Sequence, residues 1–167
     1  MQNSEDFLNN LRSEIIHTQE RRSSLVRQKL TFVTSLLGLG SISFGEKAGT
    51  SILLYIAPII AFIFDLYILG EDFSVKRAGG FLGRKDSKAS EEEKEWEKRA
   101  RENRDPFSQL ANPLLSILVL ILSSIILFPA MKQTLIYRVW LITNIFMILG
   151  VQVYSRYLCK KVQRFAK

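Results

Sequence analysis

Residues 52–70 have the sequence ILLYIAPIIAFIFDLYILG, which contains one charged side chain. An apolar run of this length crosses the roughly 30 Å hydrocarbon layer of a bilayer as a single helix. Two further runs of similar length follow at residues 111–130 and 137–154. The sequence therefore predicts an all-α integral membrane protein and not a soluble domain.

The composition argues against most enzymatic chemistry. The chain has 167 residues and a formal net charge of +7, with a single cysteine, Cys159, and a single histidine, His17. One cysteine excludes a disulfide framework and a thiolate metal cluster, and one histidine excludes most triad and transition-metal chemistry. We therefore expect a protein that is not an enzyme and that holds no cofactor or metal.

Residues 30–44 form a shorter apolar segment that is diluted by hydroxyl residues and glycines, so its hydropathy alone leaves a fourth span undecided. The distribution of Lys and Arg favours it. With four spans, residues 1–29, 71–110 and 156–167 share one side and carry five, ten and five basic residues, against only Lys47, Lys132 and Arg138 on the other. The positive-inside rule then predicts four spans in the cell inner membrane, with both termini cytoplasmic. A three-span model would place the basic N-terminal arm outside, which fits the rule less well.

This topology divides the chain into five parts. They are a cytoplasmic helical arm (1–29), the first two spans (30–70), a cytosolic loop (71–110), the last two spans (111–155) and a basic tail (156–167). Within the loop, Ser90 and Glu93 form a capping box at the start of a helix predicted over 90–104, which runs from acidic to basic. This helix is either a solvated connector or a partner-binding element anchored by Trp96.

Basic residues gather in three cytoplasmic places. Residues 75–86 interleave glycines with cations, which suits a phosphate group or lipid headgroups, but they match no phosphate-loop pattern. The tail is predicted to be a basic amphipathic helix that binds anionic lipid or another polyanion such as nucleic acid. The candidate polyanion-binding residues are Arg27, Lys76, Arg77, Arg84, Lys85, Arg156, Lys160, Lys161 and Arg164.

Small and hydroxyl residues recur along one face of the first span at spacings of three and four. They are Thr31, Thr34, Gly38, Ser41 and Gly45, and we call this set the stripe. The same face continues into the N-terminal arm through Arg27 and Glu20. Such a face either packs closely against another helix or lines a hydrated path between subunits.

The second intramembrane feature is Asp65, which follows Pro58 in the second span. A carboxylate in a membrane is costly and faces water or a partner. Gln152 is predicted at a similar depth on the fourth span, where its amide could donate a hydrogen bond to Asp65. Asn144 lies nearer the outer half, and no Lys or Arg is expected deep in another span. Asp65 is then either a hydrogen-bonded or snorkelling group, or a cation site, gate or proton-coupled group.

Four short spans leave no room for a conduit inside one bundle, so a path would form between protomers of a closed symmetric oligomer, such as a tetramer. In its four spans, basic ends and charged cytosolic helix, the chain resembles the small membrane effectors of bacterial anti-phage systems, CBASS-like and Hailong-like systems included. The resemblance implies an oligomeric channel, expected from Asp65 to favour cations, or a membrane-disrupting effector. It also implies opening by a cyclic nucleotide, an oligonucleotide or a soluble partner protein.

Two other classes of function remain open. One is a non-conducting scaffold that recruits a partner through Trp96. The other is a small proton-coupled exporter, although exporters of the small multidrug resistance type have compact loops and carry their acid in the first span.

Overall fold

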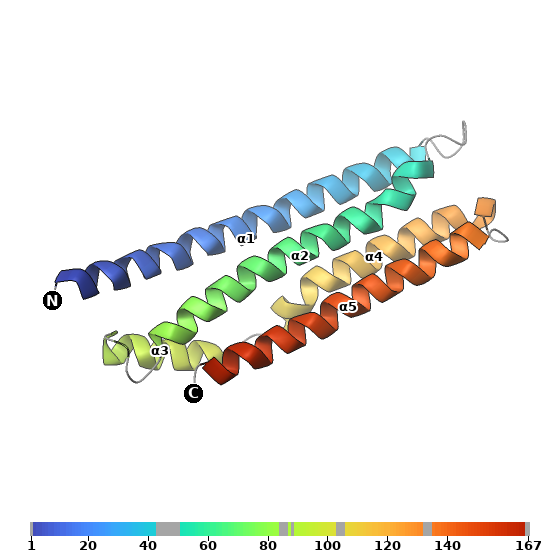
Figure 1. The fold of residues 1–167 in the computed structure, drawn as a ribbon. Helices are drawn as coiled ribbons and strands as arrows, with labels where there is room; N and C mark the ends of the chain where they lie inside the picture. The colour runs from blue at the N-terminus through green and yellow to red at the C-terminus, as the bar shows by residue number, and fades with distance from the viewer. Residues whose placement is uncertain are drawn as a thin grey trace.

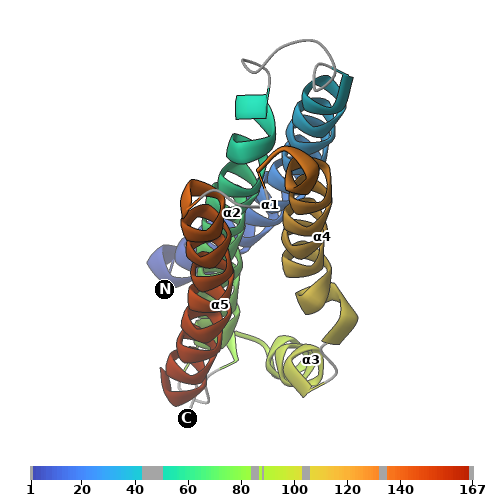
Figure 2. The same cartoon turned by 90° about the vertical axis from the view of Figure 1, so that its right-hand side faces the viewer.

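A computed structural model describes residues 2–42, 51–83, 87, 89–102, 106–131 and 135–165. Its elements are α1 (Gln2–Ile42), α2 (Ser51–Leu82), α3 (Glu91–Glu102), α4 (Pro106–Met131) and α5 (Leu135–Phe165). Four long helices lie side by side, and the short α3 lies across one end (Figures 1 and 2). All described elements are helical, as the sequence predicts.

The helix α2 is the centre of the bundle. It packs against α1 along most of its length and also contacts α3, α4 and α5. The N-terminus of α1, the C-terminal end of α5 and α3 lie at one end of the bundle, whereas α1 ends and α2 begins at the opposite end (Figure 1). The first residues of α1 and the last residues of α5 therefore lie towards the same end of the bundle.

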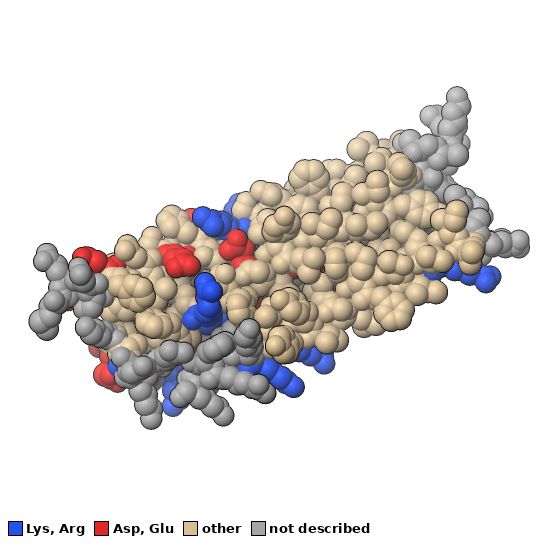
Figure 3. All heavy atoms as spheres, viewed as in Figure 1, with Lys and Arg blue, Asp and Glu red and all other residues tan. Residues whose placement is uncertain are grey.

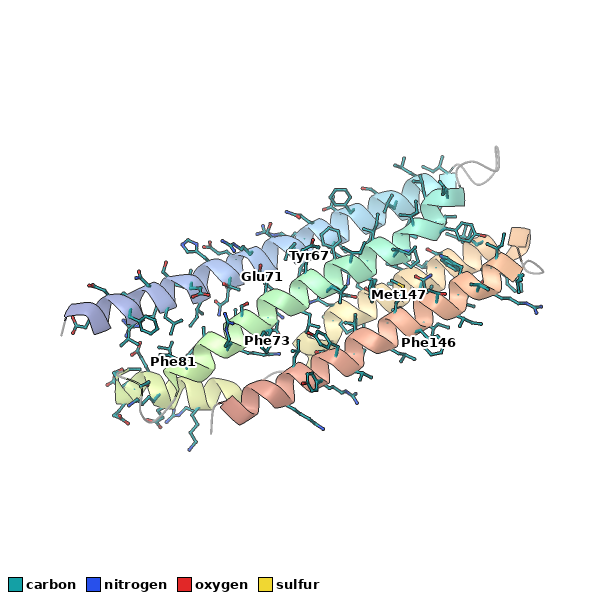
Figure 4. The ribbon with its side chains drawn as sticks, in the orientation of Figure 1. Tyr67, Glu71, Phe73, Phe81, Phe146 and Met147 are labelled. Atoms are coloured by element: carbon teal, nitrogen blue, oxygen red, sulfur yellow. The ribbon has the colours of Figure 1, made fainter. Side chains whose placement is uncertain are left out.

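Three helical segments are long and apolar enough to cross a membrane: Ile52–Leu82, Ala111–Phe128 and Leu135–Leu158. They match the three long apolar runs found in the sequence, the second of them as far as Phe128, and α1 is not among them. Large apolar side chains project outward from them, including Ile63, Ile125 and Phe146. Side chains are seen on the outer faces of the helices in Figure 4, and the described charges gather mainly towards one end of the molecule in Figure 3.

Small residues allow α1, α2 and α4 to approach one another closely. Ala57 and Ala61 of α2 are completely buried against Val33 of α1 and Val119 of α4. Gly40 of α1 lies against Leu54, and a Cβ atom added at Gly40 would lie 2.8 Å from the Leu54 side chain. Close packing of this kind is what stabilises helix pairs in an apolar solvent.

Aromatic residues join α2 and α5 at the end of the bundle away from the termini. The rings of Tyr55 and Trp140 meet edge to face at 5.2 Å, and the rings of Tyr137 and Trp140 stack at 5.9 Å. The Trp140 indole N–H donates to the Tyr55 carbonyl oxygen at 3.0 Å, in the turn that precedes Pro58. Because proline loosens the hydrogen bonding of that turn, a donor from a neighbouring helix stabilises it.

At the opposite end, the arm of α1 is held against the start of α3. Leu8, Leu82 and Ala89 form a small apolar cluster, and Phe7 meets Phe81 edge to face at 5.7 Å, near the end of α2 (Figure 4). An Arg12 guanidinium nitrogen lies 2.6 Å from Glu93 Oε1.

The predicted capping box is present at α3. The Glu93 backbone N–H donates to Ser90 Oγ at 3.2 Å, and the Ser90 backbone N–H donates to Glu93 Oε2 at 3.1 Å. Burial is the largest single influence on the pKa of Glu93 and raises it, but the bonds from Ser90 and the charge and bond of Arg12 together outweigh burial and hold the pKa below its usual value. The prediction of a helix over 90–104 is confirmed as far as Glu102, and residues 103–105 lie outside the described part.

Candidate functional site: a buried ion pair joining three helices

The intramembrane carboxylate of α2 is paired with a lysine of α1. Lys29 Nζ lies 2.6 Å from Asp65 Oδ1. The lysine is completely buried, and Asp65 is 8% exposed. Both members of the pair are therefore almost entirely removed from solvent by the bundle itself.

Two groups of α4 complete the site. Lys29 Nζ also donates to the backbone carbonyl oxygen of Asn112 at 2.9 Å, and Ser116 Oγ donates to Asp65 Oδ2 at 2.5 Å. Ser116 is itself buried. Each carboxylate oxygen thus has a donor, and one ammonium group bridges α1, α2 and α4.

This arrangement corrects the expectation that no cation lies at the depth of Asp65. Lys29 is assigned by the sequence to the cytoplasmic arm, but α1 continues without a break from Gln2 to Ile42 and places Lys29 opposite Asp65. The expected donor, Gln152, is half-buried on α5 and is not among the described partners of Asp65. Asn144 is buried, and its amide donates within α5 to the Trp140 carbonyl oxygen at 2.9 Å.

A second ion pair keeps the same register between α1 and α2. Arg22 Nε lies 3.9 Å from Asp72 Oδ1, and Lys76 also pairs with Asp72. Arg22 precedes Lys29 by seven residues, and Asp72 follows Asp65 by seven. The two helices are therefore aligned by matched charges as well as by apolar packing.

Buried ion pairs contribute little net stability, because desolvation offsets the attraction between the charges. Their clearest effect is on specificity, since a displaced register leaves a charge buried without a partner. Shifting α1 by one helical turn would separate Lys29 from Asp65 and place apolar residues beside the carboxylate. The pair therefore selects one alignment of α1 on α2 and α4.

The stripe on α1 faces away from this site. Thr31, Thr34, Gly38 and Ser41 are all exposed in the single chain, and Gly45 lies outside the described residues. Among the described residues, no atom lies within 4 Å of a Cβ built at Gly38. Close helix packing within the chain instead uses Gly40 and the alanines of α2, which the sequence analysis did not single out.

The hydroxyl groups of the stripe are bonded to their own helix. Thr34 Oγ1 donates to the Leu30 carbonyl oxygen at 2.7 Å, and Ser41 Oγ donates to the Leu37 carbonyl oxygen at 2.6 Å. Thr31 Oγ1 donates to the Arg27 carbonyl oxygen at 3.1 Å. A bonded hydroxyl retains acceptor capacity, so this face can contact either a second helix or water.

The candidate polyanion-binding residues do not form one described site. Arg27, Arg77, Arg156 and Lys160 are exposed on three different helices, and Lys76 is paired with Asp72. Arg84, Lys85 and the side chains of Lys161 and Arg164 lie outside the described part. Trp96, the candidate partner contact, is 65% exposed on α3.

Within the described residues, no group of three His, Cys, Asp or Glu side chains could hold a metal ion. The described residues thus define an all-helical bundle with three helices of membrane-spanning length and a buried ion pair, Lys29–Asp65, that joins α1 to α2. No family model, no curated protein and no solved structure matches the chain.

Proposed function

We propose that the protein is an oligomeric membrane channel or pore-forming effector in which α1 lines the path. In this proposal the chain has four spans, lies in the inner membrane and keeps both termini in the cytoplasm. The observation that carries the proposal is the stripe of α1, whose described members Thr31, Thr34, Gly38 and Ser41 are all exposed in the single chain.

The alignment of α1 with α2 supports a fourth span. About 20 residues of α2, from Ile52 to Glu71, suffice to cross the hydrocarbon layer. Glu71 lies six residues after Asp65, and Ser23 lies six residues before Lys29, so residues 23–42 of α1 lie beside this stretch. If α2 spans the membrane, residues 23–42 of α1 lie at the same depth as residues 52–71 of α2. This supports a span in α1, although the charges of α1 lower its hydropathy.

A lipid-facing position is unfavourable for this part of α1. Arg27 is exposed on the face that carries the stripe, and an arginine in hydrocarbon is costly unless it reaches water, headgroups or a partner. Small residues on the same face allow a neighbouring helix to approach closely. Contact with other copies of α1 around a symmetry axis satisfies both requirements.

The path runs between protomers because the interior of one bundle is filled. Ala57, Ala61 and Val119 are buried at its centre. The Lys29–Asp65 pair fills the interior next to them, on the side nearer the N-terminus of α1. Asp65 points into the bundle, and Thr31 and Thr34 are exposed outside it. In this proposal the carboxylate therefore holds α1 in position and does not line the path between protomers. A ring of about four copies, a tetramer, is the assembly we favour.

The cytoplasmic end offers a route for control. The Arg12–Glu93 pair and the Leu8 cluster connect α3 to the same helix that carries the stripe. A nucleotide, an oligonucleotide or a soluble regulatory protein that displaces α3 would thus act directly on α1. This is the mode of opening implied by the resemblance to anti-phage effectors.

Ion flux from liposomes that contain the purified full chain tests the proposal. Gly38→Leu should reduce flux strongly and leave thermal unfolding unchanged, because Gly38 faces open space in the single chain. The matched variant Gly40→Leu should lower the melting temperature, because its side chain would collide with Leu54. Unchanged conductance in a correctly inserted Gly38→Leu protein would remove α1 from the path.

The exposed Trp96 supports a scaffold as the second candidate. A scaffold would give no flux in the presence of cyclic nucleotides, in the presence of short oligonucleotides, or in the absence of both. The variant Trp96→Ala would abolish capture of its partner. A proton-coupled exporter fits less well, since such a protein needs a carboxylate that exchanges protons with water, and both oxygens of Asp65 accept hydrogen bonds.

A further inference from the structure

Two oxygen atoms from different helices converge on the Lys29 ammonium group. Asp65 Oδ1 approaches from α2 at 2.6 Å and the Asn112 carbonyl oxygen approaches from α4 at 2.9 Å. Ser116 donates to the other carboxylate oxygen and so fixes the orientation of the carboxylate. This set of a carboxylate, a backbone carbonyl and a supporting hydroxyl is the kind of surrounding that hard cations prefer.

We infer that Asp65 and Asn112 form a monovalent-cation site whose place Lys29 occupies in this conformation. A sodium or potassium ion enters when the ammonium group withdraws. The site contains a single carboxylate, so one positive charge balances it, whereas divalent cations take more oxygen ligands and usually more than one carboxylate.

Lys29 is suited to this exchange because its ammonium group is a compact charge on a flexible four-carbon chain. Withdrawal without replacement would leave Asp65 charged and buried, which is strongly unfavourable. Entry of a free cation keeps the site neutral while α1 is released from α2 and α4. The link between this exchange and opening rests on the proposed function, whereas the cation site itself does not.

Thermal unfolding of the detergent-solubilised full chain tests the site without measuring flux. The Lys29→Met variant and the wild type are compared in sodium, potassium and choline chloride at equal ionic strength. The wild type should unfold at the same temperature in all three salts. Lys29→Met should unfold several degrees higher in sodium or potassium than in choline, with a dependence on cation concentration that saturates.

The double variant Lys29→Met/Asp65→Asn is the matched control, and its unfolding should be independent of the cation. Equal melting of Lys29→Met in all three salts overturns the inference. If the double variant folds while Lys29→Met folds in none of the salts, no cation has replaced the ammonium, and the inference is likewise overturned. If neither folds, Lys29→Gln is subjected to the same comparison, since its amide retains a donor for Asp65. A site confirmed in a protein that gives no flux would leave the inference standing and reject the channel.

Discussion

Removing one member of the Lys29–Asp65 pair should destabilise the bundle far more than removing both. Lys29 is completely buried and Asp65 is 8% exposed, so either single change leaves a charge with no partner and little water. The expected cost of Asp65→Asn or Lys29→Met alone is about 3–5 kcal/mol. For a chain of this size that corresponds to a decrease in melting temperature of roughly 10 °C.

The double variant Lys29→Met/Asp65→Asn should recover most of this loss, because no uncompensated charge remains. Thermal unfolding followed by circular dichroism in detergent measures all four proteins, with choline as the only added cation so that no small cation replaces the ammonium. If each single change costs less than about 0.5 kcal/mol, as surface changes do, the pair is not desolvated. If the two losses simply add, Lys29 and Asp65 are not coupled, and the assignment of the site is wrong.

Two further outcomes follow from contacts at the two ends of the bundle. The pKa of Glu93 is lowered in the folded protein, so its contact with Arg12 and Ser90 stabilises the fold above the unfolded pKa of about 4.5 and is lost as the pH falls through the folded value. Glu93→Gln should therefore be less stable than the wild type at pH 7, by under about 1 kcal/mol because the side chain is only partly buried. The difference in unfolding free energy should vanish at low pH, and a difference that persists there would contradict this. Trp140→Phe keeps an aromatic ring against Tyr55 but removes the indole donor to its carbonyl oxygen, so it should cost about 1 kcal/mol in thermal unfolding. Tyr55→Leu keeps the backbone carbonyl that accepts this bond but removes the ring, so it is the control. An equal loss in both variants would show that ring packing, and not the hydrogen bond, is responsible.

Features encoded by neighbouring residues could be predicted from the sequence. The three apolar runs lie in three helices of membrane-spanning length, and the Ser90–Glu93 capping box begins α3. These features depend on composition and short spacing, which the sequence displays directly.

Features that depend on the pairing of helices could not be predicted. Lys29 stands beside Arg27 and Gln28 in the sequence, and all three look like residues of a polar arm. Only the alignment with α2 shows that Lys29 is buried while Arg27 is exposed. The seven-residue spacing shared by Arg22 and Lys29 with Asp65 and Asp72 was the available signal, but it acquires meaning only once α1 and α2 are known to be antiparallel neighbours.

Gly38 and Gly40 show the same limit on a smaller scale. Both lie in the segment LGLGSI of the first helix, and the spacing rule singled out Gly38 because it aligns with Thr34 and Ser41. In the fold, Gly40 allows close contact with Leu54 and Gly38 faces outward. A helix with two glycines on different faces can therefore pack within its own chain through one and remain available to a second chain through the other.

The two faces of α1 also explain why its hydropathy alone does not predict that it packs along α2. Hydropathy averages all side chains of a helix, whereas the cost of a charge depends on what that charge faces. On the inner face, Lys29 is neutralised by Asp65, so its charge does not oppose insertion of the assembled hairpin. On the outer face, Arg27 and the described residues of the stripe remain exposed in the single chain, and the stripe hydroxyls are bonded only within α1. The charge on the inner face is thus compensated and Arg27 on the outer face is exposed, which is the reason the proposed path follows α1.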